Sequence, residues 1–390
     1  MEPLKSGTGT SELSDAQSAG REAAGTAAKS LDGATPLLVL VYASVRYDLA
    51  ELLVGIRSVT GETPLAGMTS SGHFAGENVA GPGQGVAVLV LGGGEYRFGV
   101  ASAAGMRADP ERVGTDVARA ARAAAKHPDV ADLPHAAMLL FTDGIGGDQQ
   151  VVLTGVHRVH GAAVPVVGGA AGDDKQMVRT SVFCNDEVLT DAVVGVWVGS
   201  PRPLSVASAH GWKPVSLPVL ITRSEGSVIH EIAGRPAAEV FLELASADSD
   251  KPLHSDSSMW QIAYALGLIE PDGGHLVRAV FLTPDGRITT FTPIPAYSAV
   301  QLMAADPGTL MSVVDGVVAE SLVYGDETVL LAFDCIGRME YFGDNYPDEI
   351  VRMIAAAQGA VCFGSYTYGE FARARGVGGV HNATLTTLAL

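Results

Sequence analysis

The sequence has few cysteines and no long hydrophobic run. Its three cysteines, Cys184, Cys335 and Cys362, are odd in number and widely spaced, so neither a disulfide framework nor a zinc-binding pattern fits them. No apolar stretch reaches the roughly 18 residues that a membrane-spanning helix needs, and the first residues do not have the pattern of a secretory signal. We therefore expect reduced, buried thiols in a cytoplasmic protein that has no membrane partner.

Positive charge is scarce as well. Lysine and arginine together number 25 against 43 aspartates and glutamates, which leaves a formal net charge of −18 at pH 7. Binding to nucleic acid needs clustered basic side chains that neutralise phosphates, so nucleic acid is not expected as a partner. By contrast, 47% of the residues are apolar, and a chain of 390 residues can bury a large core. This length is typical of two domains rather than one.

Several catalytic and nucleotide-binding motifs do not occur. The glycine turn at residues 168–172 does not match GxGxxG, and the sequence contains neither GKS nor GKT, which leaves dinucleotide and Walker-type sites unsupported. Without GxSxG or HxxxH segments, we assign neither a catalytic residue nor a metal ligand. Two nucleophiles stay open as an alternative: Cys335, which Arg338 follows, and the hydroxyl-rich turn Thr69–Ser71, which His73 follows. Either would belong to a hydrolase or a transferase.

A pattern of elements occurs twice in the sequence. In the first half, apolar runs at 85–91 and 136–141 flank Ala108-Asp109-Pro110, and the pattern ends in the glycine turn 167–174. In the second half, runs at 276–282 and 328–333 flank Ala305-Asp306-Pro307, and the pattern ends in the turn 363–370. Each Ala-Asp-Pro segment predicts the start of a helix. We predict an α/β (mixed α+β) fold of two related mixed-sheet domains, with helices packed on the sheets, produced by internal duplication. Residues 86–198 and 276–390 should share one topology.

Composition divides the chain into three parts. Residues 1–34 are rich in small residues without apolar periodicity, and they predict a flexible leader. Residues 35–232 and 233–390 would form the two domains, because prolines and glycines mark a boundary within residues 200–235. A cleft between related domains is a natural site for a small ligand. Because the last turn of each repeat follows a buried strand, we expect both turns to lie close together and line that cleft.

The candidate ligand-binding residues come from these turns and from one arginine. Small residues at a strand end expose backbone N–H groups and let a ligand approach, acidic side chains can receive an amine, and arginine can hold a carboxylate. Arg338 should contact a carboxylate on a ligand or on Asp173, Asp174 or Glu370. Tight structural turns would explain the same glycines equally well. The candidate set is Ser70, Ser71, Gly169, Ala170, Asp173, Asp174, Arg338, Tyr366, Glu370 and Asn382.

Several segments together resemble the FIST family, in which a FIST N and a FIST C region are paired. In chain order, the matching segments are Val167–Asp174, Ala209–Trp212, Cys335–Arg338, Gly364–Glu370 and His381–Thr384. One segment departs from the family pattern, because Met68 stands where cysteine is usual and His73 where an acid is usual. A role for that acid in ligand binding therefore has no counterpart here.

The resemblance implies a sensory module of bacterial signal transduction that binds a small ligand, with amino acids as the proposed ligands. We expect a cytoplasmic sensor that closes around an amino-acid-like ligand between its domains. The signal would pass to a separate protein such as a histidine kinase or a cyclic-di-GMP enzyme. Some members are similar to haem-binding nitric oxide sensors, so haem is the alternative cofactor, and it needs an exposed axial His or Cys in an apolar pocket. Otherwise no cofactor is expected.

Overall fold

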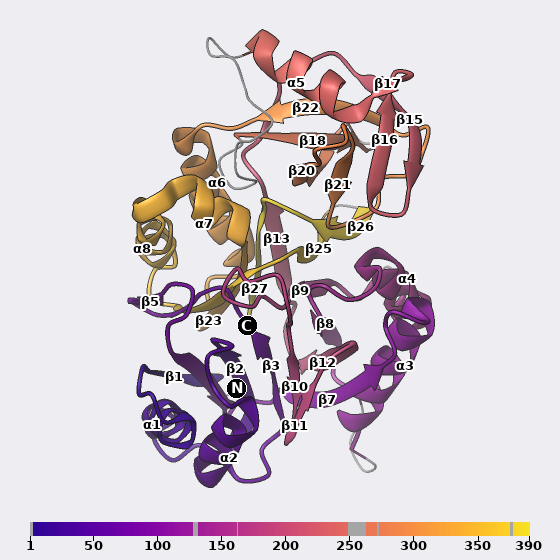
Figure 1. The fold of residues 1–390 in the computed structure, drawn as a ribbon. Helices are drawn as coiled ribbons and strands as arrows, with labels where there is room; N and C mark the ends of the chain where they lie inside the picture. The colour runs from indigo at the N-terminus through magenta and orange to yellow at the C-terminus, as the bar shows by residue number, and fades with distance from the viewer. Residues whose placement is uncertain (1–2, 128–131, 162, 249–262, 271–272, 375–376) are drawn as a thin grey trace.

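The computed structural model describes residues 3–127, 132–161, 163–248, 263–270, 273–374 and 377–390. It is a mixed α/β fold in which helices pack on mixed sheets (Figure 1). One structural unit occurs three times along the chain. Its elements are an outer strand, a helix, a central strand, further helix, a strand parallel to the central one, a hairpin and a final strand.

The three units have the following elements. The first consists of β1 (Lys5–Ser11), α1 (Ala16–Lys29), β2 (Pro36–Ala43), α2 (Leu49–Thr60), β3 (Leu65–Thr69), β4 (His73–Ala75), β5 (Asn78–Ala80) and β6 (Val86–Gly92). The second consists of β7 (Arg97–Ala104), α3 (Pro110–Ala124), β8 (His135–Thr142), α4 (Gln149–His160), β9 (Val166–Ala170), β10 (Val182–Cys184), β11 (Glu187–Leu189) and β12 (Ala192–Ser200). The third begins with β13 (Ser205–Ala209) and continues after an insertion with α6 (Pro307–Ser321), β23 (Val329–Cys335), α7 (Ile336–Phe342), η2 (Gly343–Asn345), α8 (Pro347–Ala356), β24 (Val361–Thr367), β25 (Glu370–Ala374), β26 (Val377–His381) and β27 (Leu385–Ala389).

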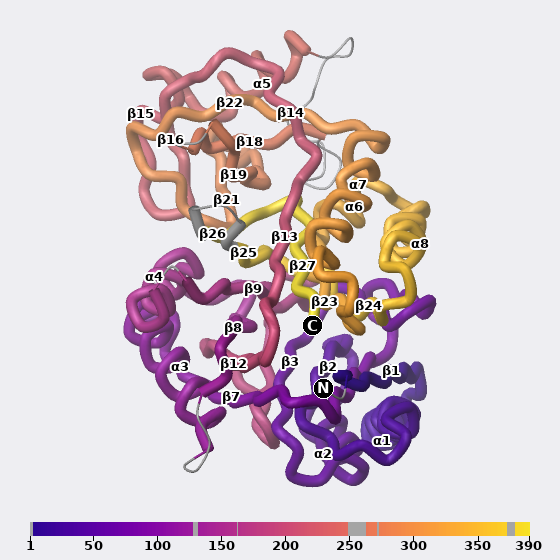
Figure 2. Tube along the Cα trace, turned by 180° about the vertical axis from the view of Figure 1, so that it is seen from behind, coloured from indigo at the N-terminus to yellow at the C-terminus, as the bar shows by residue number. Residues whose placement is uncertain are grey.

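The insertion between β13 and α6 forms its own layer at one end of the molecule, at the top of Figures 1 and 2. Its sheet has the order β19-β18-β22-β15-β16-β21-β20, with β14 paired to β22 and β17 to β16. Helix α5 packs on this sheet, and Phe241, Ile229 and Leu302 share one apolar core. The elements are β14 (Lys213–Pro214), β15 (Val219–Glu225), β16 (Val228–Ile232), β17 (Arg235–Pro236), α5 (Ala237–Asp248), β18 (Tyr264–Ile269), β19 (His275–Arg278), β20 (Val280–Leu282), β21 (Ile288–Thr290) and β22 (Ala299–Ala304).

The three units are interlocked through their hairpins. Each hairpin extends the sheet of another unit: β4–β5 joins β24, β10–β11 joins β3, and β25–β26 joins β9. The resulting sheets have the orders β1-β6-β2-β3-β10-β11, β26-β25-β9-β8-β12-β7 and β13-β27-β23-β24-β4-β5. Because this exchange is cyclic, one unit can separate from the other two only if strand pairing is lost in two sheets.

Equivalent positions of the three units meet in the core. On the central strands, Tyr42, Phe141 and Phe333 form a triangle of aromatic rings with centroids 6.2, 6.5 and 6.1 Å apart. All three side chains are fully buried. The rings are tilted or edge-on to one another, which is a favourable arrangement for aromatic groups. The centre of the molecule is therefore built from one aromatic residue of each unit.

Glycines repeat at equivalent positions as well. In each parallel strand pair a glycine lies opposite a central-strand residue: Gly67, Gly168 and Gly364. A Cβ there would lie 2.1, 1.9 and 2.6 Å from the carbonyl oxygen of that residue. The helix pairs of the first two units also cross at glycines, which are Gly20 and Gly55 in the first pair and Gly114 and Gly155 in the second. A Cβ at any of these four glycines would lie 2.1–2.3 Å from a backbone oxygen of the partner helix.

The predicted duplication is confirmed, and the structure extends it to a third copy. The predicted bounds of the repeat are wrong, because residues 86–92 end the first unit and residues 276–282 belong to the insertion. Asp109 caps α3 by accepting a hydrogen bond from the amide of Arg112 at 3.0 Å, and Asp306 caps α6 by accepting one from Thr309 at 2.9 Å. In both helices a proline occupies the first turn, as the two Ala-Asp-Pro segments predicted. The sheets nevertheless cross the expected boundary at residue 232, because β4, β5 and β13 all belong to the sheet of β23.

The prediction of a flexible leader at residues 1–34 is wrong. Strand β1 pairs with β6 over its seven residues, and α1 packs on α2 and the first sheet. The error has a physical cause, because small residues rather than large apolar ones form the buried face of α1. These residues are Ala16, Ala19, Gly20, Ala23, Ala24 and Ala27. Within the described residues, no helix combines the length and apolarity needed to cross a membrane.

Candidate functional site

The three units meet where β3, β9 and β24 end. Each strand continues into a short turn, and three equivalent backbone hydrogen bonds join the turns in a ring. The amide of Ser71 donates to the carbonyl of Tyr366 (3.2 Å), that of Gly172 to Thr69 (3.0 Å), and that of Tyr368 to Ala170 (3.0 Å). We call these turns, residues 69–73, 170–174 and 366–370, the central junction.

The central junction contains most of the predicted ligand-binding residues. Gly169 pairs with Glu370 between β9 and β25, so the expected proximity of the two glycine turns is confirmed. The turns pack directly on one another, however, and form a closed contact where an open cleft was predicted. Asn382 adjoins the junction, because its side-chain nitrogen lies 3.5 Å from the carbonyl of Tyr368. Of the predicted residues in or beside the junction, Asp174 is half-buried, and the others are buried: Ser70, Ser71, Gly169, Ala170, Asp173, Tyr366, Glu370 and Asn382.

Asp173 links the second unit to the third. Its carboxylate is 1% exposed and accepts hydrogen bonds from the backbone amides of residues 177–179 at 2.7–2.9 Å. It also accepts one from the hydroxyl group of Tyr368. Both oxygens are therefore used by the protein itself. Asp173 shapes the loop that follows it and joins that loop to the turn after β24.

Asp174 links the same loop to the first unit. Its carboxylate accepts hydrogen bonds from the hydroxyl of Ser44 at 2.7 Å and from the amide of Gly83 at 2.8 Å. Asp174, Lys175 and Met177 have φ angles of 54°, 68° and 56°, a left-handed conformation that non-glycine residues rarely adopt. Each costs on the order of 1–3 kcal/mol and persists only where surrounding contacts fix it. The two aspartates supply those contacts.

A pocket of about 470 Å³ opens beside this loop. One wall is formed by the start of α2 and the segment before it, and the other by residues of the loop after β9 and by β11. Two oppositely charged side chains line it: Asp48, which caps α2, and Arg179, which is exposed. Asp173 lines it too. The remaining lining is Val45, Tyr47, Leu49, Ala50, Gln176, Val178, Ser181 and Val188.

Ser70 and His73 form a hydrogen-bonded pair in the first turn. The hydroxyl oxygen of Ser70 lies 3.2 Å from Nδ1 of His73. Burial, and then the charge of Arg46, lower the pKa of His73 to about 4, so its ring is neutral at pH 7. The pair resembles a nucleophile and its base, but both side chains are at most 1% exposed. In this conformation a substrate does not reach the hydroxyl group.

Glu370, the last residue of the central junction, lies beside Cys335. The carboxyl group of Glu370 accepts hydrogen bonds from the hydroxyl of Thr367 at 2.8 Å and the amide of Thr384 at 3.4 Å. Burial raises the pKa of Glu370 to about 8. Burial, and then the carboxyl of Glu370, raise the pKa of the Cys335 thiol well above its usual range. A thiol that is buried and protonated is a poor nucleophile, which weighs against the predicted alternative that Cys335 is catalytic.

Arg338 contacts carboxylates, but not the predicted ones. Its guanidinium donates two hydrogen bonds to Glu349 Oε1, one of them from Nε at a distance of 3.1 Å. The same Nε lies 3.1 Å from Asp334 Oδ1. Arg338 also donates to the carbonyls of His210 and Leu310, each at 3.0 Å. Asp173, Asp174 and Glu370 were the wrong partners, because Arg338 lies on α7 and the next α-helix, α8, brings Glu349 to its guanidinium. All three charged side chains are fully buried.

Family models match almost the whole described fold. The FIST N domain model matches residues 37–235, and the FIST C domain model matches residues 237–373. The chain belongs to the FIST family. FIST domains are associated with sensory signalling. In this FIST protein the interlocked units do not follow the division between the two models, because the third unit begins at β13 within the FIST N match.

Several relatives of this FIST protein are described as uncharacterized proteins. A protein of Methanocaldococcus jannaschii is 24% identical over 224 residues, which is 57% of this chain and 43% of that protein. A protein of Mycobacterium tuberculosis is 26% identical over 247 residues, 62% of this chain and 60% of that protein. A protein of Mycobacterium bovis is 34% identical over 79 residues, 20% of each chain. The matches therefore span about half of the length of the first two relatives.

Two solved structures share a low similarity with this FIST protein. A cyanuric acid hydrolase from A. caulinodans has a TM-score of 0.29 and 12% identity, covering 50% of this chain and 71% of that one. A second cyanuric acid hydrolase structure, described as an evolutionary innovation by structural concatenation, has a TM-score of 0.30 and 10% identity over 100% of both chains. Similarity at this level supports no statement about activity.

The pocket lined by His135 and His160 lacks the apolar wall that a haem site needs. The free cysteines Cys184, Cys335 and Cys362 are all buried. His135 and His160 line a second pocket, but three basic side chains and one acid share its wall, so the wall is mixed rather than apolar. Both ring nitrogens of His160 are also enclosed by the protein. Within the described residues, no group of three or more histidine, cysteine or acidic side chains could hold a metal ion.

Three residues of the site were missed from the sequence. Tyr368 was left out of the candidate set, and Ser44 was not considered, although Ser44 follows a continuous apolar run and so lies at a strand end. Arg278 is 2% exposed and donates to the carbonyls of Val277 and Val380, which joins β19 of the insertion to β26. Burial lowers the pKa of Arg278 to about 10. Nothing in the sequence of β19 signals that this arginine is buried.

Proposed function

We propose that this FIST protein is a cytoplasmic sensor for a small zwitterion of the amino-acid type, bound in the pocket beside Asp173. A separate signalling protein, such as a histidine kinase or a cyclic-di-GMP enzyme, reads the bound state. One observation carries the proposal: Asp173 lines the pocket and also holds the hydroxyl of Tyr368 in the FIST C region. The pocket lies between the first and second units, so the ligand site moves from the expected interdomain cleft into the FIST N region.

The lining supports a zwitterionic ligand. Arg179 forms no ion pair with any described residue, and a guanidinium presents a planar fork that fits a carboxylate. Asp48 uses Oδ1 to cap α2, where it accepts from the amides of Ala50 and Glu51, and its second oxygen can receive an ammonium group. Apolar residues of the same lining, including Val45 and Leu49, would contact the ligand's side chain. The volume falls in the range of about 300–1,000 Å³ found for small-ligand sites.

The loop after Asp173 supplies the coupling. Its left-handed residues make this conformation costly, so a ligand that touches Val178 and Arg179 would stabilise it against alternatives. The backbone amides of the same two residues donate to Asp173, which holds Tyr368. Ligand binding in the FIST N region would therefore fix the turn after β24 in the FIST C region. A partner that contacts the C region would sense the change.

Calorimetric titration with the individual L-amino acids tests the proposal on the full chain. At least one should bind, and a concentration 100-fold above its Kd should stabilise the protein by about 2.7 kcal/mol in a denaturation experiment. Arg179→Gln should weaken binding roughly tenfold or more, because a charge-assisted hydrogen bond is lost. Asp48→Asn should weaken it while it keeps the helix cap, since asparagine caps as well as aspartate.

Arg21→Gln is the matched control, because Arg21 is an exposed arginine on α1 outside the pocket lining. It should bind the same amino acid with unchanged affinity. If no amino acid binds, or if Arg179→Gln and Arg21→Gln behave alike, the proposed ligand pocket is wrong.

The hydrogen-bonded pair of Ser70 and His73 keeps a hydrolase as a second candidate function. Opening of the central junction would expose the hydroxyl group to a substrate. A fluorophosphonate probe would then label the wild-type protein and leave Ser70→Ala unlabelled. An unlabelled wild-type protein would remove this candidate.

A further inference from the structure

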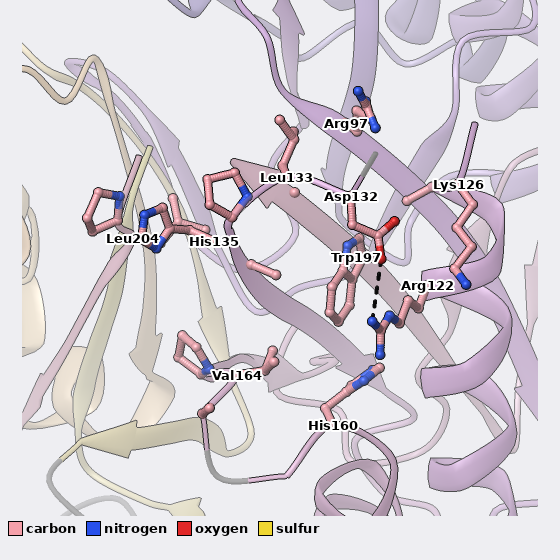
Figure 3. Close-up of a pocket in the computed structure, with 17 residues that line it drawn as sticks. Arg97, Arg122, Lys126, Asp132, Leu133, His135, His160, Val164, Trp197 and Leu204 are labelled. Atoms are coloured by element: carbon pink, nitrogen blue, oxygen red, sulfur yellow. Dashed lines mark ion pairs between the residues drawn. The ribbon is translucent and has the colours of Figure 1, made fainter. Parts of the chain in front are cut away.

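A second pocket, of about 460 Å³, lies at the opposite end of the second unit from the central junction (Figure 3). His135 begins β8 and Pro165 immediately precedes β9, so the pocket is at the amino ends of these parallel strands. The ends of α3 and α4 contribute Arg122 and His160. Its lining shares no residue with the pocket beside Asp173. Binding here is therefore separable from the function proposed above.

The charge of this pocket differs from that of the chain as a whole. Among the described residues that line it, the basic side chains of Arg97, Arg122 and Lys126 outnumber the one acid, Asp132, in a protein whose net charge is −18. Arg122 lies 3.5 Å from Asp132, and both side chains are about half exposed, so this ion pair is weak. Lys126 is exposed and forms no ion pair with a described residue. Arg122 and Lys126 are therefore available for an anion.

An indole ring forms the centre of the pocket. Figure 3 shows Trp197 between the cationic side chains on one side and apolar residues, including Val164 and Leu204, on the other. The guanidinium of Arg122 lies 5.2 Å from the indole centroid, and the ring of His160 lies 4.7 Å from it. Burial, and then Arg122, lower the pKa of His160 to about 4, so its ring adds a neutral planar surface.

Helix geometry explains only part of this arrangement. Basic residues are common in the last turn of a helix, where they complement the negative end of its dipole, and this accounts for Arg122 and His160. It does not account for Arg97 and His135, which begin strands. Nor does it account for a half-buried indole at the centre of a hollow large enough for a small molecule.

We propose that this pocket binds an organic anion that carries a planar ring. The anionic group would lie against Arg122 and Lys126, and the ring would lie on Trp197 beside Val164 and Leu204. An aromatic ring on an indole surface and an anion at a guanidinium are both favourable contacts, and together they select this class of ligand over inorganic anions and neutral rings.

Two pairs of probes test the proposal by calorimetric titration of the full chain. Adenosine monophosphate is compared with adenosine, and 2-naphthoate with 2-naphthamide, at low and at physiological ionic strength. At least one anion should bind, and its neutral counterpart should bind at least roughly tenfold more weakly. Added salt should reduce the affinity for the anion. If neither anion binds, or if a neutral probe binds as well as its anion, the proposal is overturned.

Variants locate the site. Replacing Arg122 and Lys126 together by glutamine should weaken binding of the anion roughly tenfold or more. Arg119→Gln is the matched control, because Arg119 is an exposed arginine of the same helix outside the pocket. Trp197→Phe should abolish the change in tryptophan fluorescence that binding causes. Equal binding by the double variant and the control, or a fluorescence change that survives in Trp197→Phe, would place the anion elsewhere and overturn the proposal.

Discussion

Tyr368 donates its hydroxyl hydrogen bond to the carboxylate of Asp173, and this contact joins the third unit to the second. Both side chains are 1% exposed, so the hydrogen bond is shielded from water. Burial, and then the hydrogen bond to Asp173, raise the pKa of Tyr368 far above its usual range, which keeps the hydroxyl protonated as a donor. The contact therefore depends little on pH near neutrality.

Tyr368→Phe should lower the free energy of unfolding by about 1–3 kcal/mol, because it removes one donor from a buried carboxylate. It should also speed hydrogen exchange of the amides of residues 177–179, since these donate to the same carboxylate. Urea denaturation and exchange measured by mass spectrometry check the two effects. Lower stability with unchanged exchange would mean that Tyr368 does not order the loop.

Tyr366→Phe, unlike Tyr368→Phe, should not lower the free energy of unfolding. The hydroxyl of Tyr366 is buried and has no hydrogen-bond partner within the described residues. Removal of an unsatisfied buried hydroxyl costs nothing and relieves its desolvation, so the free energy of unfolding should stay unchanged or rise by about 1 kcal/mol. The same urea experiment measures it. A loss as large as that of Tyr368→Phe would show that the Tyr366 hydroxyl has a partner after all.

Arg338→Met should lower the free energy of unfolding by about 3–5 kcal/mol, because it leaves Glu349 and Asp334 buried without a counter-charge. Amino-acid binding in the pocket beside Asp173 should be unaffected in whatever fraction stays folded, since Arg338 does not line that pocket. Adding Glu349→Gln to the variant should recover part of the loss. If the two changes are additive in urea denaturation, the buried pair is not coupled.

The sequence predicted those features that depend on local chemistry. The helix caps Asp109 and Asp306 follow from the preference of aspartate before a proline-started helix, and the meeting of the glycine turns follows from their place at strand ends. The partner of Arg338 could not be predicted in this way. Glu349 is eleven residues away in the sequence. It reaches the guanidinium only because α7 ends and the chain turns before α8 begins.

The third repeat was missed for a related reason. Helix α1 buries alanine and glycine, so its apolar face is too weak in the sequence to distinguish it from a polar linker. Its contact with α2 depends on closeness rather than on side-chain size, because Gly20 and Gly55 let the two backbones approach. The pocket beside Asp173 was not predicted either, since its walls come from segments more than 100 residues apart.

Gly20→Ala tests whether the first unit is an integral part of the fold. A Cβ at Gly20 would lie 2.3 Å from the carbonyl oxygen of Leu52, so α1 and α2 must separate and the free energy of unfolding should fall by about 1–3 kcal/mol. Gly25→Ala is the matched control on the same helix, because its Cβ meets no atom within 4 Å. It should stabilise the protein by about 0.5–1 kcal/mol through helix propensity. Equal behaviour of both variants in thermal unfolding would mean that α1 does not pack on α2.

Glu370→Gln should change how stability depends on pH. Burial raises the pKa of Glu370 from 4.5 to about 8, so between these pH values the folded protein holds a proton that the unfolded chain has released. Stability contributed by this proton is fully present below pH 4.5 and is lost as pH rises toward 8. Glutamine cannot ionise and keeps an oxygen for the hydroxyl of Thr367. The variant should therefore gain stability relative to the wild type as pH rises, by at most about 1.4 kcal/mol per pH unit.

Urea denaturation at several pH values from 4.5 to 8 measures the difference, with the exposed Glu62→Gln as a control whose profile should run parallel to that of the wild type. A constant difference between Glu370→Gln and the wild type across this range would mean that Glu370 does not titrate there.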